Sequence, residues 1–257
     1  MRTIAISNHK GGVGKTTTAV NLAGALARAG YRTLLVDADA QAHATFWFVD
    51  DPDEIQFDLQ DIIRNTVPLE KVIRPTRIED LDMLPATLAL APLELELVSM
   101  PRREDRVKRA LAPAEKTYDF CIIDLAPNLS LVTLAALVAA TDIIAPVSAT
   151  KLALGGLGAF LRWTDDFRRE DVITAPLLGV LVTMVEPRTR VTKEVLEALG
   201  ESGLPLFTAT IPRRIAAEDQ VSERLVAGDP GANPAISEAY LAFAQEVIER
   251  TGVGNAR

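Results

Sequence analysis

The stretch His9-Lys10-Gly11-Gly12-Val13-Gly14-Lys15-Thr16-Thr17 decides the fold of this chain. It follows an apolar run over residues 3–7 and precedes a helical pattern over residues 18–29. A strand that delivers a glycine-rich loop to the start of a helix brings backbone N–H groups and the positive end of the helix dipole to one anion. The sequence therefore predicts a phosphate-binding loop, with Gly11, Gly12, Val13 and Gly14 around the phosphates.

Three side chains of this loop are predicted to contact the bound nucleotide. Lys15 reaches the terminal phosphates, the Thr16 hydroxyl ligates Mg²⁺, and Thr17 belongs to the nucleotide-binding set. The loop departs from the usual G-x-x-x-x-G-K-[ST] pattern, because His9 stands at the first glycine and a second lysine, Lys10, follows it. The simplest alternative for Lys10 is a solvated surface charge.

The second chemical element is a pair of carboxylates, Asp37 and Asp39, which follow the apolar run Leu34-Leu35-Val36. Buried strands of parallel sheets end at the edge where ligands bind, so these carboxylates are expected to face the phosphate loop. The alternative interpretation is a solvated strand end or a helix cap.

The third element is the run Phe120-Cys121-Ile122-Ile123-Asp124. Apolar residues that end in an aspartate are typical of a Walker B strand, whose carboxylate holds Mg²⁺, usually through a water. Alone the pattern is weak, because buried strands often end in aspartate. Together with the glycine loop it is a strong indication of a site for a nucleotide and Mg²⁺.

Length and composition predict one domain over residues 1–257. The chain has 257 residues, of which 48% are hydrophobic, so it can bury a large core. No apolar run reaches membrane-spanning length and residues 1–7 lack the features of a signal peptide, so we expect a cytoplasmic protein and no membrane partner. Cys121 is the single cysteine, which excludes an internal disulfide.

Apolar β-type runs alternate with helical patterns along the chain. This alternation predicts an α/β fold with a mostly parallel, twisted sheet and helices on both faces. Strands are expected near residues 2–7, 32–37, 81–84, 119–124, 142–148, 177–183 and 206–211. Helices are expected near residues 16–29, 58–65, 91–99, 103–112, 130–139, 155–170, 191–201 and 235–250.

The K-G-G-V-G-K-T-T string resembles the deviant Walker A motif of the ParA/MinD family of dimerising P-loop ATPases. The resemblance implies that Lys10 crosses to the nucleotide of a partner subunit, whereas Lys15 acts on the nucleotide of its own subunit. It therefore implies a homodimer that forms on ATP, so that nucleotide state controls assembly.

The run Asp37-Ala38-Asp39-Ala40-Gln41 resembles the D-x-D-P-Q motif of ParA proteins, with Ala40 in place of proline. The resemblance assigns Asp39 to the attacking water and Asp37 to the Mg²⁺ shell or to support of the loop. The implied catalytic residues are Lys10, Lys15 and Asp39, and the implied metal residues are Thr16, Asp37 and Asp124.

Further matches cover nearly the whole chain and are similar to the Soj/ParA branch of the family. They include Leu84-Pro85-Ala86, Thr183-Met184 and Ile211-Pro212-Arg213. In the family the segment after the matched proline closes over the adenine. Pro212 and Arg213 match the P-R-N motif there and are assigned to nucleotide binding, whereas Arg214 replaces the asparagine.

Non-specific DNA binding is the second activity that the resemblance implies. Arg188 matches an arginine that contacts DNA in the Soj branch, and Arg213 and Arg214 are added as DNA-binding candidates. The family has a second arginine at the position that Ala216 occupies in this chain. The net charge of −8 also argues weakly against binding to nucleic acid. The predicted patch is open to the alternative of a solvated charged rim without DNA. Supporting phosphate contacts are expected from Arg190, Lys193 and Arg224.

Two departures from the family pattern concern the surroundings of the site. Phe46-Trp47-Phe48 stands where small residues are usual, and aromatic side chains there favour core or interface packing over a ligand pocket. Gly155-Gly156 replaces an acidic-glycine pair in a region that lies near the dimer interface in the family, which is expected to alter the lifetime of the dimer.

Taken together, the resemblance implies a nucleoid-associated, ParA-like ATPase whose slow, Mg²⁺-dependent hydrolysis is stimulated by a ParB-like or other adaptor. The cargo is left open between a chromosome, a plasmid and a protein assembly. An alternative, a MinD-like membrane-surface ATPase, needs a basic amphipathic C-terminal helix. Residues 235–250 instead carry Glu238, Glu246 and Glu249 against Arg250. A third alternative, an iron–sulfur protein of this fold, needs bridging cysteines, whereas this chain has a single cysteine.

Overall fold

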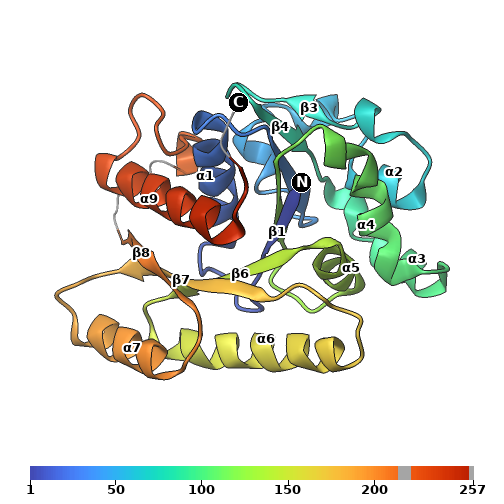
Figure 1. Cartoon of the computed structure of the whole chain (residues 1–257). Helices are drawn as coiled ribbons and strands as arrows, with labels where there is room; N and C mark the ends of the chain where they lie inside the picture. The colour runs from blue at the N-terminus through green and yellow to red at the C-terminus, as the bar shows by residue number, and fades with distance from the viewer. Residues whose placement is uncertain (214–220, 255–257) are drawn as a thin grey trace.

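The computed structural model describes residues 1–213 and 221–254 of the chain. Within these residues eight strands form one sheet in the order β3-β4-β2-β5-β1-β6-β7-β8 (Figure 1). Neighbouring strands are parallel except for β3 and β4, which pair antiparallel at one edge. The α/β fold with a mostly parallel sheet is therefore confirmed.

The strands are β1 (Arg2–Ile6), β2 (Thr33–Ala38), β3 (Arg74–Pro75), β4 (Leu81–Leu84), β5 (Phe120–Leu125), β6 (Asp142–Ser148), β7 (Leu177–Val185) and β8 (Leu206–Pro212). The helices are α1 (Lys15–Arg28), α2 (Leu59–Arg64), α3 (Leu93–Ser99), α4 (Arg106–Leu111), α5 (Leu131–Ala139), α6 (Lys151–Arg169), α7 (Arg190–Glu201) and α9 (Pro234–Thr251).

Two apolar cores lie on the two faces of the sheet. One core joins the outward side chains of β1 and β5, such as Ile4 and Phe120, to α1 and α9. The other joins the opposite faces of the strands to α2–α7. Both faces of the central strands are covered, so these strands consist almost entirely of buried apolar residues. Among the described residues no helix is long and apolar enough to cross a membrane.

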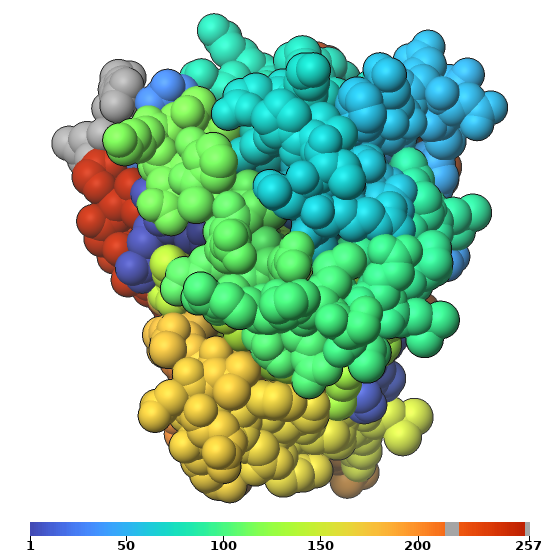
Figure 2. All heavy atoms as spheres, turned by 90° about the vertical axis from the view of Figure 1, so that its right-hand side faces the viewer, coloured from blue at the N-terminus to red at the C-terminus, as the bar shows by residue number. Residues whose placement is uncertain are grey.

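The helices of the second face form two groups. Figure 2 shows the cyan to green segments with α2, α3 and α4 as one continuous surface above the yellow end of α6. Helices α6 and α7 lie together below the sheet in Figure 1 and are joined by an ion pair between Lys151 and Glu194 with an N–O distance of 2.6 Å. This group covers β6 and β7.

Strand β1 lies between β5 and β6, which is the point where the strand order reverses direction. Parallel α/β sheets bind ligands outside the carboxyl ends of their strands at such a point. The glycine loop follows β1, Asp124 lies near the end of β5, and Asp37 lies near the end of β2 on the far side of β5. The topology therefore gathers all three predicted elements at one edge.

Candidate nucleotide-binding site

The loop between β1 and α1 has the backbone form of a phosphate cradle. Gly12 and Gly14 adopt left-handed conformations, with φ of 70° and 84°. Residues other than glycine rarely adopt such φ angles, so these two glycines permit the turn. Helix α1 begins at Lys15 without a side-chain cap, which leaves its first N–H groups available to an anion.

Two polar residues to which the sequence analysis assigned no role hold this loop to the sheet. The Asn8 amide donates to the carbonyl of Pro146 at 2.8 Å, and its oxygen accepts from the Lys10 backbone N–H at 3.1 Å. The Thr183 hydroxyl donates to the carbonyl of Val13 at 2.9 Å. Strands β6 and β7 thus fix both ends of the loop. Because each contact joins segments far apart in the chain, no local pattern reveals it.

Lys15 lies inside the loop and is only 7% exposed. Its ammonium donates to the carbonyl of Lys10 at 3.1 Å, which holds the side chain folded over its own loop. Burial lowers the pKa of Lys15, and the carboxylates of Asp124 and Asp39 oppose that change. The Lys15 ammonium is therefore held where the phosphates of a nucleotide in the same subunit would lie.

Lys10 lies on the other side of the loop, against the start of α6. A methyl group added at Gly156 would lie 3.2 Å from the Cβ atom of Lys10 and 3.8 Å from the ring of His9. Gly156 therefore leaves room for the two residues that open the loop. Gly155, its neighbour, has no atom within 4 Å of such a group. Of the two unusual glycines, only Gly156 contacts the site.

Asp37 is fully buried, and both of its carboxylate oxygens accept hydrogen bonds from the following loop. The backbone N–H of Asp39 donates to one oxygen at 3.1 Å, and the backbone and hydroxyl of Thr45 each donate to the other at 2.8 Å. Burial raises the pKa of Asp37 to about 6. Of the two roles that the resemblance offers, this geometry favours support of the loop.

The carboxylate of Asp39 is almost buried, with 9% of the residue exposed. One of its oxygens accepts from the backbone N–H of Gln41 at 2.9 Å. Its charge acts on Lys15, since it raises the pKa of that lysine. Asp39 thus lies at the loop in an orientation fixed by its own turn, as a residue that orients a water needs to be.

Asp124 is fully buried beside Asp37, because the two residues are register partners on β5 and β2. Among the described residues neither carboxylate oxygen has a hydrogen-bond partner. Burial, and then the charge of Asp37, raise the pKa of Asp124 well above its usual range, whereas the nearby Thr16 hydroxyl and Lys15 ammonium oppose the rise. Two unpartnered carboxylate oxygens beside a threonine hydroxyl fit Mg²⁺, a hard cation that prefers oxygen ligands.

Pro212, Arg213 and Arg188, the described members of the set predicted to contact the base or DNA, lie at the carboxyl ends of β7 and β8. Pro212 ends β8, and the backbone N–H of Arg213 donates to the carbonyl of Val185 at 3.0 Å. The Arg213 guanidinium forms an ion pair with Glu186 at 3.0 Å. Arg188 is exposed on the turn before α7. Arg214 lies outside the described residues, as does Ala216.

The other basic candidates differ in their partners. Arg190 pairs with Glu194 at 2.7 Å, and Arg224 pairs with Asp50. Lys193 and Arg188 are exposed and form no ion pair in the described part of the chain. Of the described arginines that were predicted to contact DNA, Arg188 is thus the one whose charge is not paired with a carboxylate. Arg224 instead contacts the segment that follows the Asp39 loop.

The aromatic run at residues 46–48 divides between core and surface. Trp47 is 5% exposed and Phe48 packs against the core of the α1 face, so the expectation of packing holds for both. Phe46 is 39% exposed and lines a hollow of about 310 Å³ next to Thr16 and Thr17. Packing does not account for Phe46.

A parallel sheet with a glycine loop after β1, a buried lysine in that loop and a Walker B aspartate on β5 defines a P-loop NTPase of the deviant Walker A type. Comparison with known proteins agrees. A family described as an AAA domain matches residues 1–175. Soj, the sporulation initiation inhibitor protein of Bacillus subtilis, is 37% identical over 95% of this chain and 97% of its own length.

The chromosome partitioning protein ParA of Myxococcus xanthus is also 37% identical, over 97% of this chain and 88% of its own length. Among solved structures, a Mycobacterium smegmatis protein described as cobyrinic acid a,c-diamide synthase, with an ATP analogue and magnesium bound, is 33% identical. That structure matches with a TM-score of 0.85 and covers 100% of this chain and 98% of its own. The chain belongs to the ParA/Soj family of P-loop partitioning ATPases.

Proposed function

We propose that this chain, working as one domain, is an ATPase that dimerises on ATP, binds DNA without sequence preference, and releases it after hydrolysis. The observation that carries the proposal is the division between the two lysines of the loop. Lys15 folds over its own loop, whereas the side chain of Lys10 runs along Gly156 of α6. A lysine in that position is available to the nucleotide of a second subunit.

Magnesium and hydrolysis belong to the same proposal. Thr16 and Asp124 hold Mg²⁺, and Asp37 orders the loop around it. Mg²⁺ neutralises charge that develops on the transferred phosphoryl group. Asp39 orients the attacking water, and Lys15 holds the terminal phosphates. One oriented carboxylate without further acid or base groups suits slow hydrolysis, which a ParB-like or other adaptor accelerates.

The DNA surface is proposed around Arg188, at the carboxyl ends of β7 and β8. Two copies of this surface in a dimer bind one duplex together, which raises avidity without any new contact. Such binding ties the protein to the nucleoid only while ATP keeps the dimer intact. The net charge of −8 opposes DNA binding over the rest of the surface.

The C-terminal helix supports DNA rather than a membrane as the surface on which the protein acts. The apolar side chains of α9, among them Tyr240 and Phe243, are buried against the sheet and α1. Glu246 accepts from the backbone N–H groups of Thr208 and Ala209, at 2.9 Å and 3.2 Å. A helix whose apolar face is already packed has little left to insert into lipid.

Light scattering tests the dimer directly. We expect a monomer without nucleotide or with ADP, and a dimer with Mg²⁺ and a slowly hydrolysed ATP analogue. Retention of a random-sequence DNA duplex should appear only in the second condition and should weaken steeply as salt rises. A monomer under all conditions would refute the dimer. A dimer that ignores DNA at low salt would make a protein or lipid surface the better partner.

A further inference from the structure

The proposed DNA surface contains carboxylates as well as arginines. Glu186 follows the end of β7 directly, and one of its carboxylate oxygens accepts from the guanidinium of Arg213 at 3.0 Å. In the first turn of α7 the carboxylate of Glu194 pairs with Arg190 at 2.7 Å. A carboxylate binds a guanidinium through the same charge-assisted hydrogen bonds that a phosphate would form. Two arginines that were predicted to bind DNA phosphates therefore already have an anionic partner within this chain.

A tight turn fixes Glu186 close to Arg188. The backbone N–H of Thr189 donates to the carbonyl of Glu186 at 2.9 Å, which closes a four-residue turn with Pro187 in second place and Arg188 in third. Proline favours the second place because its φ is already suited to it. The Thr189 hydroxyl donates to the same carbonyl at 3.0 Å, and the backbone N–H of Glu186 donates to the Thr192 hydroxyl at 3.3 Å. The backbone that carries the negative charge is therefore held firmly within the surface.

The ion pair between Glu186 and Arg213 is not needed to hold the fold together. The backbone N–H of Arg213 already donates to the carbonyl of Val185 at 3.0 Å, so the ends of β7 and β8 are joined without their side chains. The side chains of Arg213 and Glu186 are 68% and 45% exposed. Ion pairs this exposed contribute little to stability, because water and salt screen both charges. Stability therefore does not account for a carboxylate at this position.

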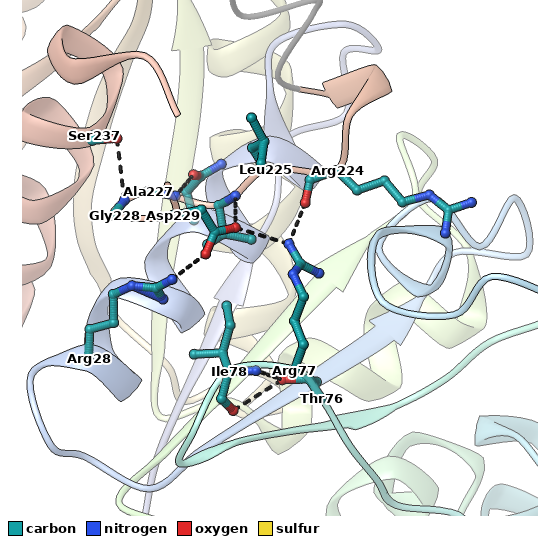
Figure 3. A network of polar contacts seen from close by, with 12 residues as sticks. Arg28, Thr76, Arg77, Ile78, Arg224, Leu225, Ala227, Gly228, Asp229 and Ser237 are labelled. Carbon is teal, nitrogen blue, oxygen red and sulfur yellow. Dashed lines mark hydrogen bonds and ion pairs between the residues drawn. The ribbon is translucent and has the colours of Figure 1, made fainter. Parts of the chain in front are cut away.

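Asp229 shows how a carboxylate with a structural role is held in this protein (Figure 3). Its side chain is only 10% exposed and pairs with both Arg28 and Arg77. It also accepts from the backbone N–H of Val226 at 2.7 Å, so that it joins three separate parts of the chain. Among the described residues the carboxylate of Glu186 accepts from one guanidinium and from no backbone N–H. The two carboxylates therefore differ in what their loss would disturb.

We infer that Glu186 is an intramolecular competitor of DNA, which occupies the place of a backbone phosphate on Arg213 and keeps the DNA affinity of one subunit low. A duplex that binds here has to displace the carboxylate from Arg213. The displaced charge then lies two residues from Arg188 and repels the phosphates that Arg188 attracts. This inference rests on the proposed function, because it names a residue that sets the affinity of the proposed DNA surface.

This competition makes DNA binding depend on the dimer. Of the described cations predicted for this surface, Arg188 and Lys193 form no ion pair with another described residue, so a monomer releases few counterions when it meets DNA. A dimer presents twice as many unpaired cations to one duplex. A surface whose cations were all unpaired would retain DNA as a monomer, and the control that ATP exerts through assembly would be lost.

Retention of a random-sequence duplex at several salt concentrations, with Mg²⁺ and a slowly hydrolysed ATP analogue, tests the inference. Glu186→Gln removes the charge and keeps the shape of the side chain. We expect it to tighten DNA binding about tenfold and to steepen the salt dependence, because each subunit gains about one phosphate contact. Without nucleotide it should retain DNA at low salt, where wild-type protein does not. Glu201→Gln makes the same change of net charge at the exposed carboxyl end of α7 and should alter neither property.

A second background separates displacement from simple repulsion. When Glu186→Gln is added to Arg213→Ala, the gain in affinity should be smaller than in wild-type protein, because no guanidinium remains to be released. An equal gain in the two backgrounds, or an equal gain from Glu201→Gln, would overturn the inference.

The remaining outcomes distinguish this inference from the proposed function. Wild-type dimer that retains DNA, with Glu186→Gln binding it no more tightly, would overturn the inference alone. Wild-type and Glu186→Gln dimers that both ignore DNA at low salt would overturn the inference together with the proposed DNA surface.

Discussion

Lys10 and Lys15 lie five residues apart in the loop and have different surroundings. We therefore expect substitution of each lysine to cause a different defect. We expect Lys15→Ala to lose nucleotide binding, because the buried ammonium faces the phosphates of its own site. Lys10→Ala should keep nucleotide binding but fail to dimerise with a slowly hydrolysed ATP analogue. Titration of nucleotide measures the first effect and light scattering the second. A Lys10→Ala dimer of normal stability would refute the role of Lys10 across the interface.

Asp39 is expected to matter for turnover rather than affinity. In Asp39→Ala the Mg²⁺ nucleotide should still bind, whereas the hydrolysis rate should fall by about 100-fold or more, because the lost contact acts mainly in the transition state. The ATP-bound dimer should accumulate as a result. Phosphate release and light scattering measure the two effects. Asp53→Ala, which removes an exposed carboxylate outside the site, is the control. Near-normal turnover in Asp39→Ala would assign the water to Asp37 or Asp124.

Side chains that act through short motifs could be assigned from the sequence, and those that act across the fold could not. Lys15, Thr16 and Asp124 are defined by residue type and spacing, and the structure brings them to one edge of the sheet. The contacts of Asn8 with Pro146 and of Thr183 with Val13 join distant strands. Their identity depends on the sheet order, which spacing alone does not specify.

At the scale of elements, the close approach of α1 to residues 226–228 gives a stability prediction. A methyl group at Gly24 would lie 2.4 Å from a methyl carbon of Val226, which is fully buried. Alanine favours helices over glycine by about 1 kcal/mol, but overpacking of a core costs about 1–3 kcal/mol. We expect Gly24→Ala to lower the midpoint of urea unfolding.

Gly155 provides the matched control for that substitution. It also lies in a helix, but a methyl group there would meet no atom within 4 Å, so Gly155→Ala should raise the midpoint slightly. Val226→Ala removes the obstructing methyl groups, so the double variant Gly24→Ala/Val226→Ala should lose less stability than the two single variants together. A stabilised Gly24→Ala protein would show that the segment moves aside at little cost.

Element boundaries were predictable where hydrophobic periodicity was strong and less so where local propensity opposed packing. The sequence predicts a helix from residue 155, whereas α6 begins at Lys151. Gly155 and Gly156 weaken helix propensity, but Ala153 and Leu157 are buried against the sheet and carry the helix through them. Strand β3 was not predicted, because two residues that include Pro75 give no strand pattern.

At the scale of the whole molecule, the proposed DNA surface opposes the acidic charge of the chain. Arg188→Glu should abolish retention of DNA by the ATP-bound dimer, because it replaces an exposed phosphate-binding charge with a repelling one in both subunits. Dimerisation should survive, since Arg188 lies outside the glycine loop and its carboxylates. DNA retention on a filter or sensor surface, measured at several salt concentrations, would detect the loss.

Arg169→Glu makes the same change of charge at the carboxyl end of α6, on the side of the sheet where the parallel strands begin. Arg169 is exposed and pairs with Asp166 at 3.0 Å. If net charge alone governed DNA binding, the two variants would lose retention equally. A selective loss in Arg188→Glu would locate the contact at the ends of β7 and β8.

The burial of Trp47 has an optical consequence. The chain contains two tryptophans, and the other, Trp163, stacks edge-on against Phe167 on α6. In a Trp163→Phe protein all indole fluorescence would therefore come from one ring, whose N–H donates to the carbonyl of Leu225 at 3.3 Å. Trp47 lines the same hollow as Thr16 and Thr17 of the phosphate loop, so we expect its emission maximum or intensity to change when a nucleotide binds there. The protein thus carries an intrinsic spectroscopic reporter of nucleotide occupancy that needs no attached dye.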